Sequence, residues 1–233
     1  MRCLDFGRTR AGFPTATMIK KTEKVREILA ILNRLYPFDG RCFLHYDHEQ
    51  PWQLLFATIL SAQCTDARVN IVTQNLFRQF PTLEAFAAAN LPDIEKAVHQ
   101  TGFFRAKARH LQKSAVALLA NHGGALPSDI AALTALSGVG RKTANVVRGH
   151  IFGIPSIVVD THVMRVSRKL GLTENTDPTK IEYDLMAILP EESWFPFNQQ
   201  VILHGRAVCV ARRPKCEQCE FRLACLCSTG QKS

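Results

Sequence analysis

The stretch Leu136 to Val147, LSGVGRKTANVV, places two closely spaced glycines just before a lysine. Because glycine has no Cβ, Gly138 and Gly140 predict a tight turn. The backbone N–H groups of Gly138, Val139 and Gly140 would then be accessible to a ligand. A helix is predicted from Arg141, and the unpaired N–H groups at a helix start favour an anion such as a phosphodiester. The stretch therefore indicates a phosphate-binding turn with Lys142 beside it, or an ordinary turn followed by a surface lysine.

A second concentration of chemistry is the C-terminal cysteine cluster, in which five of the eight cysteines fall within residues 209–227. Cys209, Cys216, Cys219 and Cys225 are separated by six, two and five residues, so four thiolates can converge on one centre. Sulfur ligation of this kind suits zinc or an iron–sulfur cluster, and spacing alone favours zinc as the commoner occupant. Cys227 is not needed, because four ligands complete the shell. Crowded cysteines in a chain without a signal sequence indicate a reduced compartment.

Positive charge is concentrated between the first two of these cysteines, where Arg212, Arg213 and Lys215 lie. We interpret this segment as a basic loop for phosphate contacts, although a solvated charged loop would have the same composition. The whole chain of 233 residues has a formal net charge of +9, which favours a polyanionic partner such as nucleic acid or an anionic membrane surface. No apolar run approaches the length of a membrane helix, so we expect no membrane span.

Apolar residues at helical spacing, with glycine and proline signals between them, predict an all-α fold that positions these groups. The segment Pro155 to Val159 has the composition of a strand but is too isolated to form a sheet. The helices are predicted over residues 18–36, 51–62, 67–80, 83–89, 92–100, 104–122, 128–136, 141–152, 161–170, 178–189 and 197–210.

From about residue 18 to residue 227 the chain resembles the endonuclease III family of DNA glycosylases, within the helix-hairpin-helix superfamily. Four stretches carry the resemblance, and their order and cysteine spacing fit the family together: LLFATILSAQCTD, LSGVGRKTANVV, VVDTHVMRV and LHGRAVCVARRPKCEQCEFRLAC. The sequence SWFPFNQQ, which precedes the last stretch, departs from the His-rich form of the family.

The resemblance implies two helical domains that flank a DNA-binding groove. A six-helix domain over residues 44–154 would carry the helix-hairpin-helix, and residues 18–43 and 155–233 would form a discontinuous four-helix domain with a [4Fe–4S] cluster. The resemblance implies that Cys209, Cys216, Cys219 and Cys225 are the ligands of that cluster and do not bind zinc. Residues 1–17 fall outside the family pattern, and we expect them to be a disordered tail.

The resemblance also implies roles for single residues. Lys142 matches the nucleophile of the family, Asp160 its catalytic carboxylate and Gln63 the residue that fills the gap left by a flipped base. From the sequence alone Asp160 is a good N-cap for the helix that follows, and the two roles are compatible. Phe103, after the Gly102 turn, could help Gln63, but we interpret it as a core aromatic.

The predicted function is a bifunctional glycosylase and AP lyase that removes oxidised pyrimidines from duplex DNA and cleaves 3′ to the abasic site through a lysine imine. The alternative is a DNA-binding module with a structural or redox metal centre and no enzymatic activity, and Lys142 distinguishes the two because such a module needs no nucleophile. We expect a cytoplasmic, nucleoid-associated monomer that is not secreted and whose partner is damaged double-stranded DNA.

Overall fold

The computed structural model describes residues 16–226, with side chains from Thr22 onward. Within that range the chain forms α-helices and short 3₁₀ turns and contains no strand, which confirms the all-α fold. The elements are α1 (Ala16–Leu35), α2 (Trp52–Leu60), α3 (Asp66–Gln79), α4 (Leu83–Ala88), α5 (Leu91–Val98), η1 (His99–Thr101), α6 (Phe104–His122), α7 (Ile130–Ala135), α8 (Arg141–Phe152), α9 (Thr161–Lys169), α10 (Pro178–Ile188), η2 (Glu191–Ser193), α11 (Trp194–Ala207) and η3 (Cys216–Gln218). Of the predicted tail, residues 1–15 lie outside the described residues, and α1 begins at Ala16.

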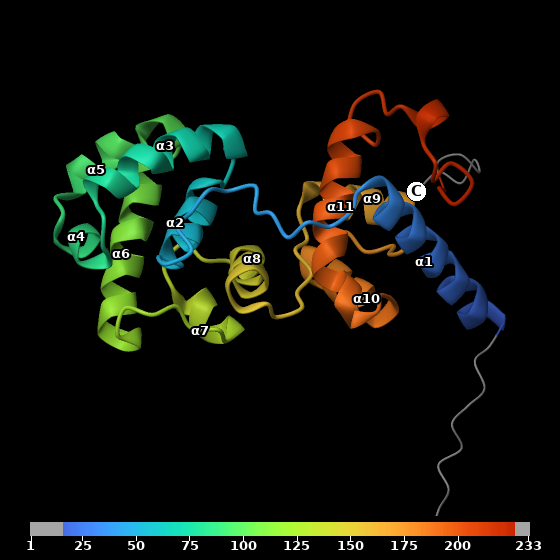
Figure 1. The fold of residues 1–233 in the computed structure, drawn as a ribbon, viewed down its shortest axis with the longest axis horizontal. Helices are drawn as coiled ribbons and strands as arrows, with labels where there is room; N and C mark the ends of the chain where they lie inside the picture. Colours follow the sequence, from blue (N-terminus) through green and yellow to red (C-terminus); the bar gives the residue numbers. More distant parts are fainter. Residues whose placement is uncertain (1–15, 227–233) are drawn as a thin grey trace, which may run out of the picture.

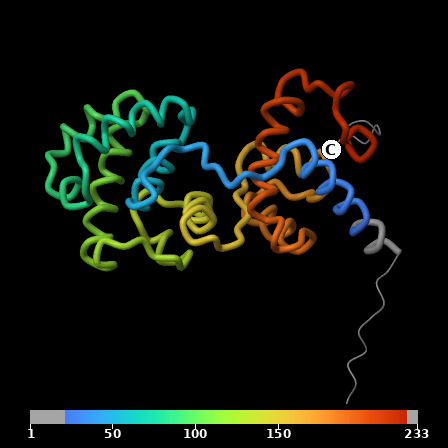
Figure 2. Tube along the Cα trace, in the orientation of Figure 1, coloured from blue at the N-terminus to red at the C-terminus, as the bar shows by residue number. Residues whose placement is uncertain are grey.

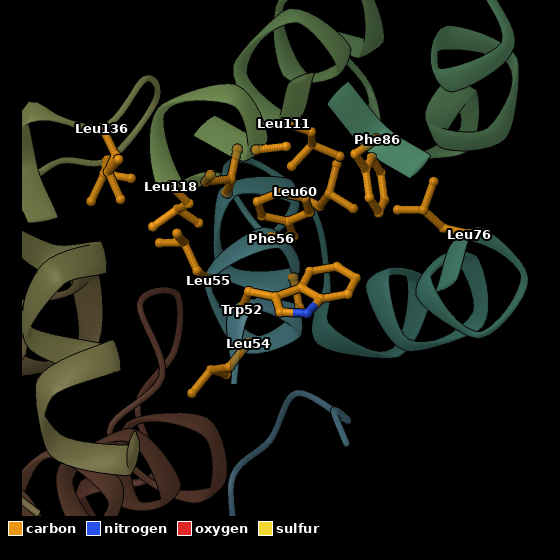
Figure 3. Packing of buried hydrophobic residues seen from close by; sticks show 14 of the residues in the cluster. Trp52, Leu54, Leu55, Phe56, Leu60, Leu76, Phe86, Leu111, Leu118 and Leu136 are labelled. Atoms are coloured by element: carbon orange, nitrogen blue, oxygen red, sulfur yellow. The ribbon is translucent and has the colours of Figure 1, made fainter. Parts of the chain in front are cut away.

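The helices form two groups that lie side by side, with α2 to α8 in one and α1, α9, α10 and α11 in the other (Figure 1). The first group is built around α2, all of whose residues are buried. Aromatic rings pack edge to face beside it, with the Trp52 and Phe56 centroids 5.2 Å apart and those of Phe56 and Phe86 4.9 Å apart (Figure 3). Such pairs add to the stability gained from burying apolar area. The helix α2 is therefore the buried centre around which the other helices of this group pack.

The second group joins the two ends of the described chain. Ile28 and Leu32 of α1 share a core with Val163 of α9 and Phe197 of α11, and the trace in Figure 2 brings the blue and red segments together. The buried residues of the first core lie between Leu44 and Val147. The second core is built from residues on either side of that range, residues 25–32 and 157–221. The limits of the two predicted domains stay a prediction.

Ion pairs join the two groups. Arg141 at the start of α8 contacts Glu182 of α10 through two hydrogen bonds, Nε to Oε2 at 2.7 Å and Nη2 to Oε1 at 2.8 Å. Arg206 of α11 contacts Asp66 of α3 at 2.7 Å. Glu182 is buried, so its carboxylate depends on Arg141 for compensation, and the pair fixes α8 against α10.

The last long helix differs from its prediction. It begins at Trp194 and ends at Ala207, whereas the sequence predicted residues 197–210. Pro196 lies in its first turn, where a proline costs no intrahelical hydrogen bond, so the helix can begin before the proline. None of the helices described between residues 16 and 226 has the length and apolar character needed to cross a membrane.

Candidate active site and DNA-contacting surface

Lys142 and Asp160 line the same cavity, which has a volume of about 130 Å³ and lies where the two helix groups meet. Lys142 comes from the start of α8, and Asp160 immediately precedes α9. Asp66 of α3 and Phe195 of α11 contribute to other walls. The fold therefore brings together the amine and the carboxylate that the sequence singled out, and surrounds them with side chains from both groups.

The N-terminus of α8 has no side-chain cap. Its N-cap residue is Gly140, which has no side chain to accept from the first amides, and Lys142 is exposed at the second helical position. Arg141 is occupied elsewhere, because its guanidinium binds Glu182 and lies 5.2 Å from the ring centroid of Tyr183. The hydrogen bond to Glu182 raises the pKa of Arg141. Arg141 therefore holds α8 against α10, and Lys142 is the basic residue that remains exposed at the uncapped helix end.

Asp160 is the N-cap of α9, as its sequence position predicted. Its Oδ1 atom accepts from the backbone N–H groups of His162 and Val163, both at 2.8 Å. The prediction of a cap is therefore confirmed. Both bonds end on Oδ1, so capping does not use Oδ2, and the carboxyl group is only half-buried at the cavity wall.

The strand-like segment before Asp160 forms no strand, and side chains are its hydrogen-bonding partners. Asn198 of α11 accepts from the N–H of Val158 and donates to the carbonyl of Ser156, both at 2.9 Å. Asn145 of α8 donates to the carbonyl of Ile157 at 2.9 Å. These two amides replace neighbouring strands, because buried backbone groups must be paired. They also fix Asp160 relative to α8 and therefore to Lys142.

The turn before α8 is fastened to α6. Gly138 has φ +79°, and a Cβ there would lie 2.7 Å from Cγ of His110, so both conformation and space require glycine. His110 Nδ1 lies 3.0 Å from Ser137 Oγ, and Ser114 donates to the carbonyl of Ser137 at 2.8 Å. The position of the turn is thus determined by α6.

The other two residues of the turn differ from expectation. Gly140 has φ −91°, which any residue adopts, so the prediction that it is needed for a tight turn is wrong. A Cβ on Gly140 would meet nothing within 4 Å. Val139 is buried and its N–H binds the carbonyl of Leu136 at 3.2 Å. Val139 therefore anchors the turn, which leaves the amides of Gly138 and Gly140 as candidates for phosphate contact.

Two exposed side chains stand on loops of the first helix group with left-handed backbone. Gln63 has φ 54° and Phe103 has φ 47°. Phe103 is 65% exposed, so its interpretation as a core aromatic is wrong. The reason is local: Gly102 and Phe103 both have positive φ, and the chain reverses there before α6 begins. A left-handed non-glycine residue costs about 1 to 3 kcal/mol and often marks a functional site.

The four clustered cysteines lie in the segment that follows α11, from residue 209 to residue 225. Burial, and then the charges of Cys209, Cys225 and Cys216, raise the pKa of the Cys219 thiol, so these three cysteines lie near Cys219. None of the cysteines between residues 16 and 226 forms a disulfide. In the same range no three His, Cys, Asp or Glu side chains converge closely enough for a single metal ion.

The basic loop lies between the first two of these cysteines. A hydrogen bond from the N–H of Lys215 to the carbonyl of Val208, at 3.0 Å, closes it. Arg212, Arg213 and Lys215 are all exposed. Arg213 has φ 56°, so this loop too contains a residue in the left-handed region. Three exposed cations on a closed loop form a compact basic surface.

Sequence reasoning missed the cavity walls formed by His150 and Phe195. Their rings meet edge to face with centroids 4.8 Å apart. Phe195 also packs onto α8 at Gly149, where a Cβ would lie 2.0 Å from its Cε2 atom. A glycine inside a predicted helix often marks such a close approach, so Gly149 was the available signal. Phe195 lies in the stretch SWFPFNQQ, so the segment that departs from the family pattern lines the cavity.

Comparisons with known proteins agree with this geometry. Residues 56–191 match the HhH-GPD superfamily of base excision DNA repair proteins. Endonuclease III of Synechocystis sp. is 48% identical over 93% of this chain and 97% of its own length. Endonuclease III of Bacillus subtilis is 42% identical over 79% of this chain and 84% of its own length.

Solved structures give the same result. A trapped endonuclease III–DNA covalent intermediate is 40% identical and superimposes with a TM-score of 0.83, covering 88% of this chain and 95% of the other. A thermostable thymine-DNA glycosylase shares the fold at 24% identity, with a TM-score of 0.78 over 92% of this chain and 99% of the other. The matched region includes the turn before α8, Lys142 and Asp160. The chain belongs to the endonuclease III family of the HhH-GPD superfamily.

Proposed function

We propose that this protein is a base-excision DNA glycosylase and AP lyase that removes oxidised pyrimidines from duplex DNA. The observation that carries the proposal is the placement of Lys142 and Asp160 on one cavity, next to an uncapped helix end. A member of the family has been trapped as a covalent intermediate with DNA, which supports a covalent mechanism here. A binding module would need the helix end but not the paired amine and carboxylate.

The Lys142 amine attacks C1′ of the extruded nucleotide, and the bond from C1′ to the base breaks with its electron pair leaving on the base. Loss of a proton from nitrogen and opening of the sugar ring give an imine. The imine makes the hydrogens on C2′ acidic, and loss of one of them expels the 3′ phosphate by β-elimination. Asp160 stabilises positive charge on the sugar and exchanges protons through Oδ2, which capping leaves unused.

Extrusion of a nucleotide costs a few kcal/mol, which a damaged base reduces because it stacks or pairs less well. Gln63 is exposed on the loop before α3, and we assign to it the space vacated by the base. Phe103 is also exposed and suits insertion between bases, because an apolar wedge can replace lost stacking. Two side chains from separate loops would then hold the distorted duplex open.

Phosphate contacts are assigned to two surfaces. The amides of Gly138 and Gly140 precede the open end of α8, where a helix dipole favours an anion, and Val139 holds their turn in place. Arg212, Arg213 and Lys215 form the second surface on the basic loop. Contacts of this kind bind DNA of any sequence and weaken as salt rises.

The four-cysteine group fits a [4Fe–4S] cluster by its donor set. Cys209, Cys216 and Cys225 all lie near the Cys219 thiol, and cysteine thiolates are the ligands that iron–sulfur clusters use. When bound, the cluster would supply four metal–thiolate bonds that fix residues 209–225, including the basic loop. The proposed reaction itself uses only side chains of the chain and the DNA.

Borohydride reduction tests the mechanism, because it converts an imine into a stable covalent bond. Wild-type protein should be trapped on duplex DNA that contains an oxidised pyrimidine, and peptide mapping should place the adduct on Lys142. Lys142→Gln keeps the length and polarity of the side chain but cannot form an imine, so it should bind abasic DNA without cutting or trapping. Efficient strand cleavage by this variant would refute the lyase assignment.

Replacing single cysteines tests the cluster. Cys216→Ser should lose iron, sulfide and visible absorbance and bind DNA more weakly, because the basic loop loses its anchor. Cys227→Ser is the matched control and should keep the cluster; Cys227 lies outside the described residues. Stoichiometric zinc without iron in protein purified anaerobically would contradict the assignment.

We further propose that the protein acts as a monomer on DNA in the cytoplasm.

A further inference from the structure

Lys107 is a buried cation that the proposed chemistry does not use. It lies on α6 with only 4% of its surface exposed. Its Nζ donates to the carbonyl of Leu60 at 2.8 Å and to the carbonyl of Thr101 at 2.7 Å. Desolvation by burial lowers the pKa of Lys107, as expected for an amine removed from water. Burying an amine without partners is costly, so the two carbonyls are what make its position tolerable.

The two carbonyls belong to the ends of two elements that lead into the exposed loops. Leu60 is the last residue of α2, three residues before Gln63. Thr101 is the last residue of η1, two residues before Phe103. Carbonyls at the end of an α-helix lack intrahelical partners and carry partial negative charge, so a buried ammonium is well matched to the end of α2. One amine therefore ties together the starts of both loops.

These loops need an external constraint. Gln63 and Phe103 each have positive φ, and residues held there persist only when the surrounding structure determines them. A second link, between the elements that flank these loops, runs from Arg68 Nη1 on α3 to Gln100 Oε1 in η1 at 2.7 Å, but it is exposed to solvent. Lys107 is the buried link, and its two hydrogen bonds are charge-assisted and therefore stronger.

We propose that Lys107 is a positioning residue that sets the separation of Gln63 and Phe103, so that both side chains enter the duplex together. This inference rests on the roles proposed for those two residues. Inserting two side chains around one extruded nucleotide requires their loops to hold a fixed spacing. Displacement of a positioned group by 1 Å can cost about 100-fold in rate, so loosening the tie should be visible in base extrusion.

Lys107→Met tests the proposal, because methionine keeps an unbranched stem and loses the amine. Gln112→Met is the matched control: Gln112 lies on the same helix, and its Nε2 donates to the carbonyl of Ala89 at 2.8 Å, between α4 and α5. Both variants remove a side-chain donor from a backbone carbonyl next to α6. Only the first affects the ties to the Gln63 and Phe103 loops.

Three measurements separate positioning from general damage. With saturating enzyme, excision from duplex DNA should fall about 10- to 100-fold further in Lys107→Met than in Gln112→Met. Fluorescence of 2-aminopurine opposite the damaged base, which reports extrusion without chemistry, should fall in parallel. Borohydride trapping on a single-stranded abasic oligonucleotide, which needs no extrusion, should stay within about twofold of wild type.

The outcomes are distinct. Equal excision by both variants, or an equal loss on single-stranded and duplex DNA, would overturn the positioning role. If Lys107→Met does not fold, Lys107→Gln takes its place, since an amide can still donate to one of the two carbonyls, and the same comparison with Gln112→Met decides. Absence of any adduct with wild-type protein would contradict the proposed function instead, and the 2-aminopurine signal would still test Lys107.

Discussion

The N-termini of α8 and α9 both lie at the cavity, and they differ in whether a side chain caps their first backbone N–H groups. At α9 the Asp160 carboxylate accepts from the N–H groups of His162 and Val163. At α8 the N-cap is Gly140, and no side chain caps the first turn. One helix end is closed from within the protein, and the other is open to an anion from outside. The same local feature thus places a carboxylate on the cavity at one helix and leaves unpaired N–H groups at the other, which matches the catalytic and DNA-binding roles proposed for them.

Geometry does not force α8 to be uncapped. Gly140 has φ −91° and ψ 174°, which is the extended conformation that capping residues adopt, and the space around its missing Cβ is empty. Aspartate, asparagine or serine would fit. We infer that the side chain is absent because an external phosphate takes the place of the cap.

The largest effect on this contrast should come from Asp160. Asp160→Asn keeps an oxygen that can cap α9, so the melting temperature should hold, while turnover should fall by about 10²- to 10⁴-fold because the carboxylate is lost. Single-turnover excision and thermal melting measure the two effects separately.

Asp160→Ala provides the comparison, because it removes the cap as well. It should lose the same turnover and in addition about 1 kcal/mol of unfolding free energy. If Asp160→Asn remained fully active while Asp160→Ala unfolded, Asp160 would be a cap alone, and the difference between the two helix ends would not extend to catalysis.

A smaller effect is expected when α8 is made to resemble α9. Gly140→Asp should cap α8 and place a carboxylate at the proposed phosphate site, so affinity for duplex DNA should fall by about 1.5 to 3 kcal/mol. Binding at several salt concentrations measures it, and the salt slope should also decrease by about 0.9 for the lost contact. Gly140→Asn, a cap without charge, is the control. Unchanged affinity in Gly140→Asp would show that DNA does not approach this end.

Local signals in the sequence predicted part of this arrangement. Asp160 before a predicted helix indicated a cap, and the paired glycines before Lys142 indicated an open helix start. The all-α fold followed from helical periodicity in the same way. Such features depend on neighbours within one or two turns, which a sequence displays directly.

Other features depend on contacts that sequence spacing does not reveal. The exposure of Phe103 follows from two successive left-handed residues, and only Gly102 announced one of them. The cavity wall at Phe195 requires α11 to pack on Gly149. The tie from Lys107 joins carbonyls 41 positions apart in sequence, at residues 60 and 101. Long-range packing decided each of these positions.

A moderate effect on stability should distinguish the two glycines of the turn. Gly138→Ala places a methyl group 2.7 Å from Cγ of His110 at φ +79°, so unfolding free energy should fall by about 1 to 3 kcal/mol. Gly140→Ala meets open space at an ordinary φ and should change it little. Urea denaturation of both variants measures the difference. Equal losses would mean that both glycines serve the turn and that Gly140 is not reserved for an anion.

The smallest effect concerns His150, which lies in the last turn of α8 and lines the cavity. Burial lowers the pKa of His150 to about 4, whereas an unfolded histidine titrates near ~6.5. Above pH 6.5 both states are neutral there; as pH falls towards 4 only the unfolded state gains the proton, so the free energy of unfolding decreases. His150→Gln should therefore reduce the pH dependence in this window by at most about 1.36 kcal/mol per pH unit. A wild-type slope in His150→Gln would show that the wall carries charge, and the contrast between the two helix ends would then have to include it.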